Sequence, residues 1–281
     1  MKAVTFNIRC DIQPKSEAEF REMLASLPDG VKAPAVRFPK GDGVNAWELR
    51  KALDVRAIRR ASPEVVGFQE ILPHMGLYLR RELPGYTFLG HGREKDYGGE
   101  RPMVAVREDV EILAYRCFWL SPTPDEPGSR FPVQSPCPRT CAVVKLRLPD
   151  GLIFRLYDTH LDHLCPEARE AGLKQLLAVM EADNRQEPLP MMLMGDFNAD
   201  PGSAEMAPIR ENTLGLRDLT AETGPTFHGY GNPEEFIKID YIFATEPFVS
   251  AHTATRLWTQ VTDKGTYLSD HYPVEADFEL K

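Results

Sequence analysis

The chain has 281 residues, of which 42% are hydrophobic, and it carries a formal net charge of −9 at pH 7. This length and composition fit one large α/β or α+β domain, or two small ones, whose core needs no disulfide or structural metal. The acidic charge argues against broad non-specific affinity for DNA or RNA, which depends on Lys and Arg neutralising phosphates.

The predicted elements are mostly strands, with a few helices between them. Strands are predicted at 2–9, 64–69, 86–90, 102–107, 110–119, 140–147, 152–159, 190–195, 237–244, 248–257 and 272–280. Helices are predicted at 47–60, from Pro73 to about Leu83, and after Pro166. Asp150-Gly151 indicates a hairpin turn. This arrangement favours two packed sheets flanked by helices. Because no repeat or linker divides the chain, we predict one domain over residues 1–281.

The segment at about 11–40 stands apart from this pattern. It contains a capping box at Ser16–Glu19, a short amphipathic helix and a proline-rich loop. It is interpreted either as a surface excursion that packs on the body of the domain or as a lid. The lid interpretation arises because the segment leaves directly after the polar residues at the end of the first strand.

The cysteines and the apolar segments bear on the cellular compartment. The five cysteines are scattered and include no CxxC pair, so a zinc site is not expected. Reduced thiols in a cytoplasm are the simpler interpretation. The N-terminal residues lack the features of a signal peptide, and no apolar stretch approaches the ~20 residues that span a bilayer. We therefore expect a cytoplasmic protein without a transmembrane segment, and the sequence leaves its oligomeric state open.

The most informative motif is Gly195-Asp196-Phe197-Asn198, which ends an apolar run and precedes a turn. Asp196 and Asn198 are two residues apart, so they point to the same side of an extended chain. A carboxylate beside an amide suits a hydrated metal and a phosphate oxygen. A capped turn, in which both side chains bond local backbone, explains this motif alone equally well.

Further polar residues recur at or within predicted strands, namely Asn7, Glu70, His160, Asp240 and the pair Asp270-His271. Each has its own structural explanation, such as a helix N-terminus for Glu70 or a hydrogen-bonded buried acid for Asp240. A carboxylate within an apolar strand needs a charge partner or must be neutral. Because six such sites occur together, we interpret them as one functional site.

In chain order, these motifs resemble the endonuclease/exonuclease/phosphatase superfamily. The motifs are Asn7, Gln69-Glu70, Thr159-His160, Gly195–Asn198, Asp240-Tyr241 and Ser269–His271. The resemblance runs from residue 4 to residue 278 and is closest to a bacterial branch without an assigned substrate. The segment at about 11–40 departs from that branch, which passes more directly from its first strand to the Gly-Asp-Gly segment.

The resemblance implies a four-layer α/β/β/α sandwich of two mainly antiparallel sheets flanked by helices, with the site at one end of the sheets. It also implies Mg²⁺, with Mn²⁺ as the alternative, and metal ligands at Asn7, Glu70 and Asp270. An oxygen-rich ligand set without cysteine agrees with such a hard ion.

The reaction implied by the resemblance is in-line attack of water on phosphorus. Asp196 would orient or deprotonate the water, and Asn198 would hold a phosphate oxygen. His271 would be charged or positioned by Asp240. Whether Asp196 or His271 is the general base stays open at this point.

Other residues would surround the phosphate. The resemblance implies that His160 donates to the phosphate or leaving group and that Glu100 orients His160. An edge-strand charge is the alternative interpretation of Glu100. Arg139 would clamp phosphate, because a guanidinium matches two phosphate oxygens, although a surface arginine explains it equally well. Trp47, His163 and Phe227 are candidates for the substrate pocket, with core packing as the alternative for Phe227.

We therefore predict a Mg²⁺-dependent phosphoesterase that hydrolyses a phosphodiester or phosphomonoester, with the substrate unassigned. A nuclease, either a deadenylase-like 3′–5′ exonuclease or a DNA-repair endonuclease, is the alternative and would need a basic track. The acidic charge does not favour nucleic acid. A sphingomyelinase-type lipid enzyme is disfavoured because no signal peptide or hydrophobic hairpin is found, and a binding scaffold would not require all six polar groups.

Overall fold

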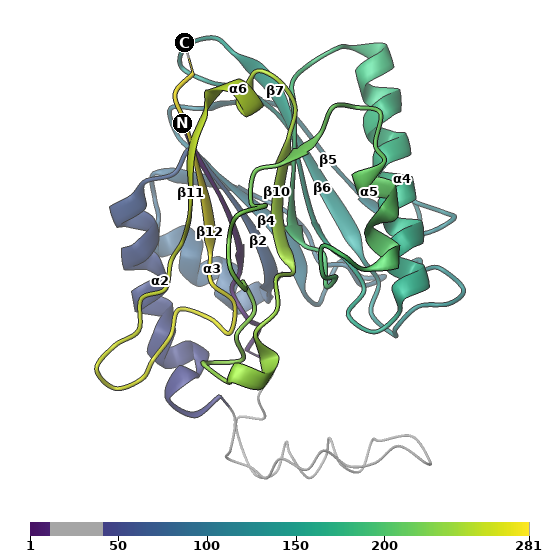
Figure 1. Ribbon diagram of the computed structural model, residues 1–281. Coiled ribbons are helices and arrows are strands. Elements are labelled where there is room, and N and C mark those ends of the chain that lie inside the picture. The colour runs from purple at the N-terminus through teal and green to yellow at the C-terminus, as the bar shows by residue number, and fades with distance from the viewer. Residues whose placement is uncertain (12–41, 281) are drawn as a thin grey trace.

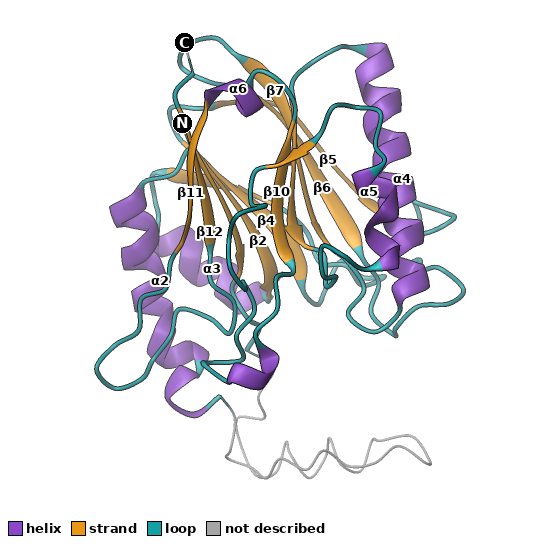
Figure 2. Cartoon of the chain, in the orientation of Figure 1, coloured by secondary structure: helices purple, strands orange, loops and turns teal. Residues whose placement is uncertain are grey.

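The described part of the protein is a sandwich of four layers. A computed structural model describes residues 1–11 and 42–280. The predicted helix and proline-rich loop at about 11–40 therefore lie, apart from residue 11, outside the described residues. Two sheets pack face to face, and helices cover the outer face of each (Figures 1 and 2). The predicted α/β/β/α sandwich is confirmed.

The sandwich is built from two six-stranded sheets. The first contains, in spatial order, β11 (His252–Leu257), β12 (Val274–Phe278), β1 (Lys2–Asn7), β2 (Val65–Ile71), β4 (Arg101–Arg107) and β3 (Tyr86–Leu89). The second contains β5 (Glu111–Trp119), β6 (Thr140–Arg147), β7 (Ile153–His160), β8 (Met191–Asp196), β10 (Asp240–Ala244) and β9 (Arg217–Asp218). Only β1–β2 and β7–β8 are parallel pairs in these sheets, so both sheets are mainly antiparallel.

Helices cover the outer faces of the two sheets. The first sheet is covered by α2 (Trp47–Ala61) and α3 (Pro73–Glu82). The second is covered by α4 (Pro166–Gln186) and α5 (Ala207–Arg210). The remaining helical turns are α6 (Phe248–Ala251) and the 3₁₀ turns at Gly43–Asn45, Ala204–Met206 and Pro233–Glu235. In the described ranges, no helix is long and apolar enough to cross a membrane.

Alternation along each strand divides its side chains between two cores. In β1, Ala3 packs between the sheets, whereas Val4 and Phe6 pack beneath the helices. Successive side chains of a strand point to opposite faces. Asn7 lies an even number of residues after Ala3, so it points to the same face, into the space between the sheets.

Several predicted strand ends differ from the structure; the predicted strands 2–9, 237–244 and 272–280, for example, are shorter in the structure. The predicted strand 248–257 is wrong in its first residues, because Phe248–Ala251 form α6 and β11 begins at His252. The ring of Phe248 packs against Phe154 and Phe278, and a short apolar run of this kind does not separate a helical turn from a strand. The strand predicted at 64–69 also ends too early, because β2 continues to Ile71.

Candidate active site

The candidate site lies between the sheets, at the ends of β1, β7, β8 and β10. Met192 and Met194 of β8 pack between the sheets, so Asp196, two residues further, points into the same space. The strand register then places His160 beside Asp196 on one side and Asp240 beside it on the other. Three neighbouring strands thus present three titratable side chains in one row.

Glu70 and Asn7 join the first sheet to this row. The Asn7 amide donates to Glu70 Oε1 at 3.0 Å and to Asp196 Oδ2 at 2.8 Å. Glu70 Oε2 accepts from the Cys10 backbone N–H at 2.9 Å. Glu70 has a φ of +67° and lies where the register between β2 and β4 shifts. Such a bulge redirects a side chain at a functional site.

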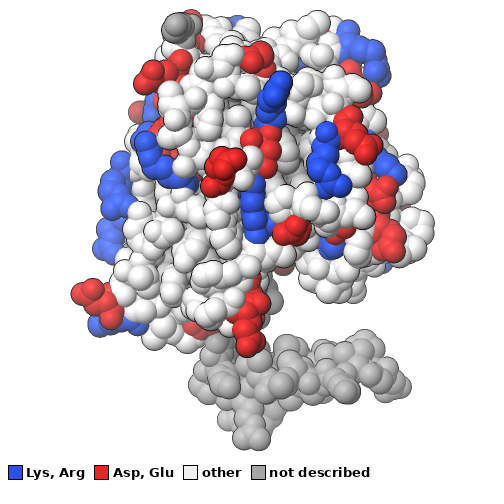
Figure 3. Space-filling view, viewed as in Figure 1, with Lys and Arg blue, Asp and Glu red and all other residues white. Residues whose placement is uncertain are grey.

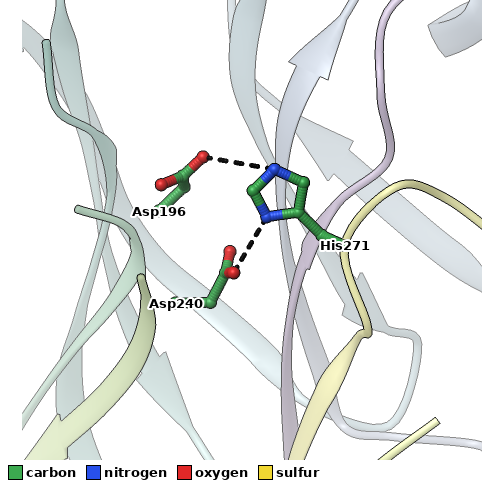
Figure 4. Close-up of side chains that lie close together, drawn as sticks. All are labelled: Asp196, Asp240 and His271. Atoms are coloured by element: carbon green, nitrogen blue, oxygen red, sulfur yellow. Dashed lines mark hydrogen bonds and ion pairs between the residues drawn. The ribbon is translucent and has the colours of Figure 1, made fainter. Parts of the chain in front are cut away.

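His271 lies between two carboxylates (Figure 4). Its Nδ1 is 2.9 Å from Asp240 Oδ2, and its Nε2 is 3.8 Å from Asp196 Oδ2. Burial lowers the pKa of His271, but Asp240 and then Asp196 outweigh it and raise the pKa to about 10. The imidazole is therefore charged at neutral pH. Phe227 packs on the same ring, with the two centroids 4.9 Å apart.

The carboxyl of Asp196 has an unusual environment. It is buried, and burial together with Asp240 raises its pKa to about 7. Asp196 Oδ1 accepts from the Asn198 backbone N–H at 2.9 Å, which fixes the carboxyl plane. A group with this pKa exchanges protons near neutral pH, as a general base requires.

Asp270 and His160 both lie close enough to Glu70 to interact with it electrostatically. Asp270 Oδ2 is 3.5 Å from Arg9 Nε, and burial raises the pKa of Asp270. His160 Nε2 is 3.5 Å from Asp196 Oδ2. Burial and then Arg139 lower the pKa of His160 well below its ordinary value, so this imidazole is neutral. For Glu70, burial raises the pKa, but the charge of Arg9 and the hydrogen bonds from Cys10 and Asn7 oppose it, and the pKa lies below the ordinary range.

A small polar pocket opens beside Glu70 and His160. Arg139, Arg93 and Glu100 line it, and Arg93 Nη1 pairs with Glu100 Oε2 at 2.9 Å. In the part of the chain that is described, no hydrogen bond joins Glu100 to His160, so the predicted contact between them is not found. Arg139 is 4% exposed, and its Nη2 donates to His163 Nδ1 at 2.8 Å.

The structure does not bring every predicted residue to the cluster. Trp47 is 2% exposed and packs beneath the helices against Tyr78, with ring centroids 5.8 Å apart. The Asn198 side-chain amide donates to the Leu161 carbonyl at 3.1 Å. Trp47 therefore contributes to the core, and one amide hydrogen of Asn198 is already used within the protein.

Sequence reasoning missed three arginines at the site. Arg9 follows β1 with φ of +57° and pairs with Asp270. Arg93 lies in the loop before β4. Arg50 is fully buried in α2, and its guanidinium donates to the carbonyls of Ile8 and Arg9. A charged residue on the apolar face of a helix was the available signal for Arg50.

A four-layer sandwich with such a buried acidic and histidine cluster at the ends of its sheets is typical of a class of phosphoester hydrolases. The chain belongs to the Endonuclease/Exonuclease/phosphatase family, whose model matches residues 4–271. The family resemblance expected from the motifs is thus confirmed. A comparison with curated proteins found no sequence match.

Solved structures share the fold over the whole chain. An endonuclease/exonuclease/phosphatase from Bacteroides vulgatus is 28% identical with a TM-score of 0.80, over 100% of this chain and 98% of that one. The mannosyl-6-phosphatase Bt3783 of Bacteroides thetaiotaomicron is 23% identical with a TM-score of 0.78, over 100% of both chains. A humanized D. rerio TDP2 is 16% identical with a TM-score of 0.71, over 100% of this chain and 99% of that one. At these identities the last two show the fold alone.

Proposed function

We propose that the protein is a divalent-metal-dependent phosphoester hydrolase that acts on a compact phosphate ester. The observation that carries this proposal is that Glu70, Asp196 and His271 lie together in one site. The Asn7 amide donates hydrogen bonds to both carboxylates. So dense an arrangement of ionisable groups is costly for folding alone, because buried charges need partners. It is understandable if the groups act on a substrate.

Glu70, with Asn7 and Asp270 beside it, fits a Mg²⁺ or Mn²⁺ ion. Each Glu70 oxygen accepts one hydrogen bond from the protein, which leaves lone pairs for a hard cation. Asp196, Asp240 and His271 are also close enough to hold an ion. We favour Glu70, because His271 Nδ1 already pairs with Asp240 Oδ2 at 2.9 Å, whereas both Glu70 oxygens keep lone pairs free.

When bound at Glu70, the cation would polarise a phosphoryl oxygen. Asp196 accepts a proton from the attacking water, and its pKa of about 7 suits that task. His271, held charged by Asp240, stabilises negative charge on the phosphate. This division of roles makes Asp196, rather than His271, the general base. Neutral His160 donates from its ring N–H to the phosphate or the leaving group.

The net charge of −9 and the mixed charge on one face of the molecule favour a compact ester over a long nucleic acid. On the face seen in Figure 3, Lys and Arg side chains are interspersed with Asp and Glu. A nucleic-acid track would instead gather basic side chains on one face.

Hydrolysis of a panel of phosphate esters with Mg²⁺ tests the proposal. The panel contains sugar phosphates, nucleotides, inositol phosphates, single-stranded RNA, abasic DNA and sphingomyelin. Asp196→Asn is the informative variant, and Asp200→Asn, in the exposed turn that follows, is its matched control. Loss of turnover by roughly 1,000-fold in Asp196→Asn alone supports the proposal. Equal turnover in Asp196→Asn and wild type contradicts the assignment of the base.

A further inference from the structure

Two buried arginines lie at the inner end of the candidate site. Arg139 is 4% exposed and Arg93 is 8% exposed. Each contributes positive charge to the other's surroundings, and burial and then Arg93 lower the pKa of Arg139. Two carboxylates lie within ion-pair distance of Arg93: Glu100 Oε2 is 2.9 Å from its Nη1, and Glu94 Oε1 is 3.8 Å from its Nε. Two like charges buried close together are unfavourable unless an anion joins them.

Several of their N–H groups have no acceptor. Arg139 Nε and Nη1 and Arg93 Nε are buried and form no hydrogen bond. Leaving a charged donor unpaired in a protein interior is unfavourable, because the group loses its hydration without gaining a partner. In native structures such groups have a functional role, or a water or an ion completes them. The unpaired atoms belong to residues that line the same pocket as Glu70 and His160.

The pocket that these residues line is small and partly open. Its volume is about 10 Å³, which is room for about one water molecule. Arg101 and Pro102 of β4 line its inner wall together with Thr140 of β6. A single oxygen atom fits this space, but an ester chain that continues past the phosphorus does not.

We propose that Arg139 and Arg93 form a small pocket for a terminal oxygen of the substrate phosphate and make the enzyme selective for phosphomonoesters over phosphodiesters. The proposal rests on the proposed function and names its substrate class. A monoester at neutral pH carries a charge of about −1.5 to −2. It has three oxygens that bear no carbon, whereas a diester has two and a single negative charge. The N–H groups of Arg139 and Arg93 that have no acceptor match the additional oxygen and charge of the monoester.

Two esters with the same leaving group test the selectivity. The kcat/KM of p-nitrophenyl phosphate and of bis(p-nitrophenyl) phosphate is measured with Mg²⁺ for wild type and Arg139→Met. We expect Arg139→Met to lower the monoester value by about 10- to 100-fold, the loss of one charge-assisted contact. The diester value should change several-fold less. A wild type that prefers the diester, or an equal loss for both esters, overturns the proposal.

Binding of inorganic phosphate gives a readout that does not need turnover. Phosphate should raise the unfolding temperature of wild type and not of Arg139→Met, whereas dimethyl phosphate should raise neither. Arg155→Met is the matched control, because Arg155 is equally buried but pairs with Glu187 at 2.7 Å. Without phosphate, Arg155→Met should lower the unfolding temperature and Arg139→Met should not, since Arg139 lacks such a partner. If phosphate raises the unfolding temperature of wild type and of Arg139→Met equally, the proposed pocket is wrong.

The two proposals fail separately. Glu70→Gln should abolish hydrolysis of both esters, and full activity in that variant contradicts the proposed function. Even in that case, the rise in unfolding temperature with phosphate, and its absence in Arg139→Met, test the pocket. If the Glu70→Gln result is as expected but Arg139→Met retains the monoester preference, the inferred selectivity fails and the hydrolase proposal stands.

Discussion

Asp196 and Asp240 face each other directly across the antiparallel strands β8 and β10. Like charges at directly opposed positions destabilise a strand pair. His271 comes from the segment before β12 and lies against both carboxyl groups (Figure 4). The histidine therefore offsets the repulsion, and the strand pair and the candidate site depend on the same side chain.

The pH dependence of stability should report this arrangement. The pKa of His271 is raised from 6.5 to about 10 on folding, mainly by Asp240 once the opposing effect of burial is overcome. Its contribution to the free energy of unfolding is therefore fully present below pH 6.5 and is lost as pH rises through about 10. In Asp240→Asn this loss should be smaller and begin at lower pH. Denaturant unfolding of the metal-free protein across that range measures the free energy of unfolding at each pH.

Asp263→Asn removes an exposed carboxylate and is the control. Identical pH slopes for wild type and Asp240→Asn would falsify the prediction.

Glu70→Gln should separate metal binding from folding. The amide keeps the size of the side chain and removes its negative charge, so we expect turnover to fall by roughly 100-fold or more. Addition of Mg²⁺ should raise the unfolding temperature of wild type but not of Glu70→Gln. Glu108→Gln, in an exposed turn, serves as the control. Full wild-type activity after exhaustive chelation would exclude a metal-dependent reaction.

Gly195→Ala should unfold the site that it precedes. Gly195 has φ of +145°, and a Cβ there would lie 1.9 Å from the Thr159 carbonyl oxygen of β7. Because that atom belongs to the neighbouring backbone, we expect a loss of about 3 kcal/mol or more of stability. Gly85→Ala is the control, since a Cβ at Gly85 meets nothing within 4 Å. Chemical denaturation compares the two variants, and equal stability would show that β7 and β8 separate without cost.

Arg50→Lys should loosen the loops that carry Asn7 and Asp270. The buried guanidinium donates to the Leu268 carbonyl at 3.2 Å as well as to carbonyls that follow β1. An ammonium cannot reach these separated acceptors together, so we expect a loss of about 2–4 kcal/mol. The concentration of Mg²⁺ needed for half-maximal activity should also rise. Arg60→Lys, exposed on the same helix, is the control. Unchanged Mg²⁺ dependence in folded Arg50→Lys would assign Arg50 to stability alone.

The strands and most of their ends could be predicted because they depend on local pattern. Alternation in residues 2–7 and the apolar run before Asp196 reflect which face of a strand is buried, and neighbouring residues record that directly. The bulge at Glu70 and the helical turn at Phe248 could not be predicted. Both depend on packing against residues that are distant in sequence.

The sequence by itself determined which chemical groups stand at the strand ends, the order in which they occur and therefore the family. Only the tertiary structure decided their partners: Asn7 lies 189 positions from Asp196 in sequence yet donates to it, and Glu100 pairs with Arg93 rather than with His160. The physical reason is sheet register, which sets which strand ends are neighbours. A pocket with guanidinium N–H groups that have no acceptor has no local signature, because burial and missing acceptors exist only once the two sheets are packed.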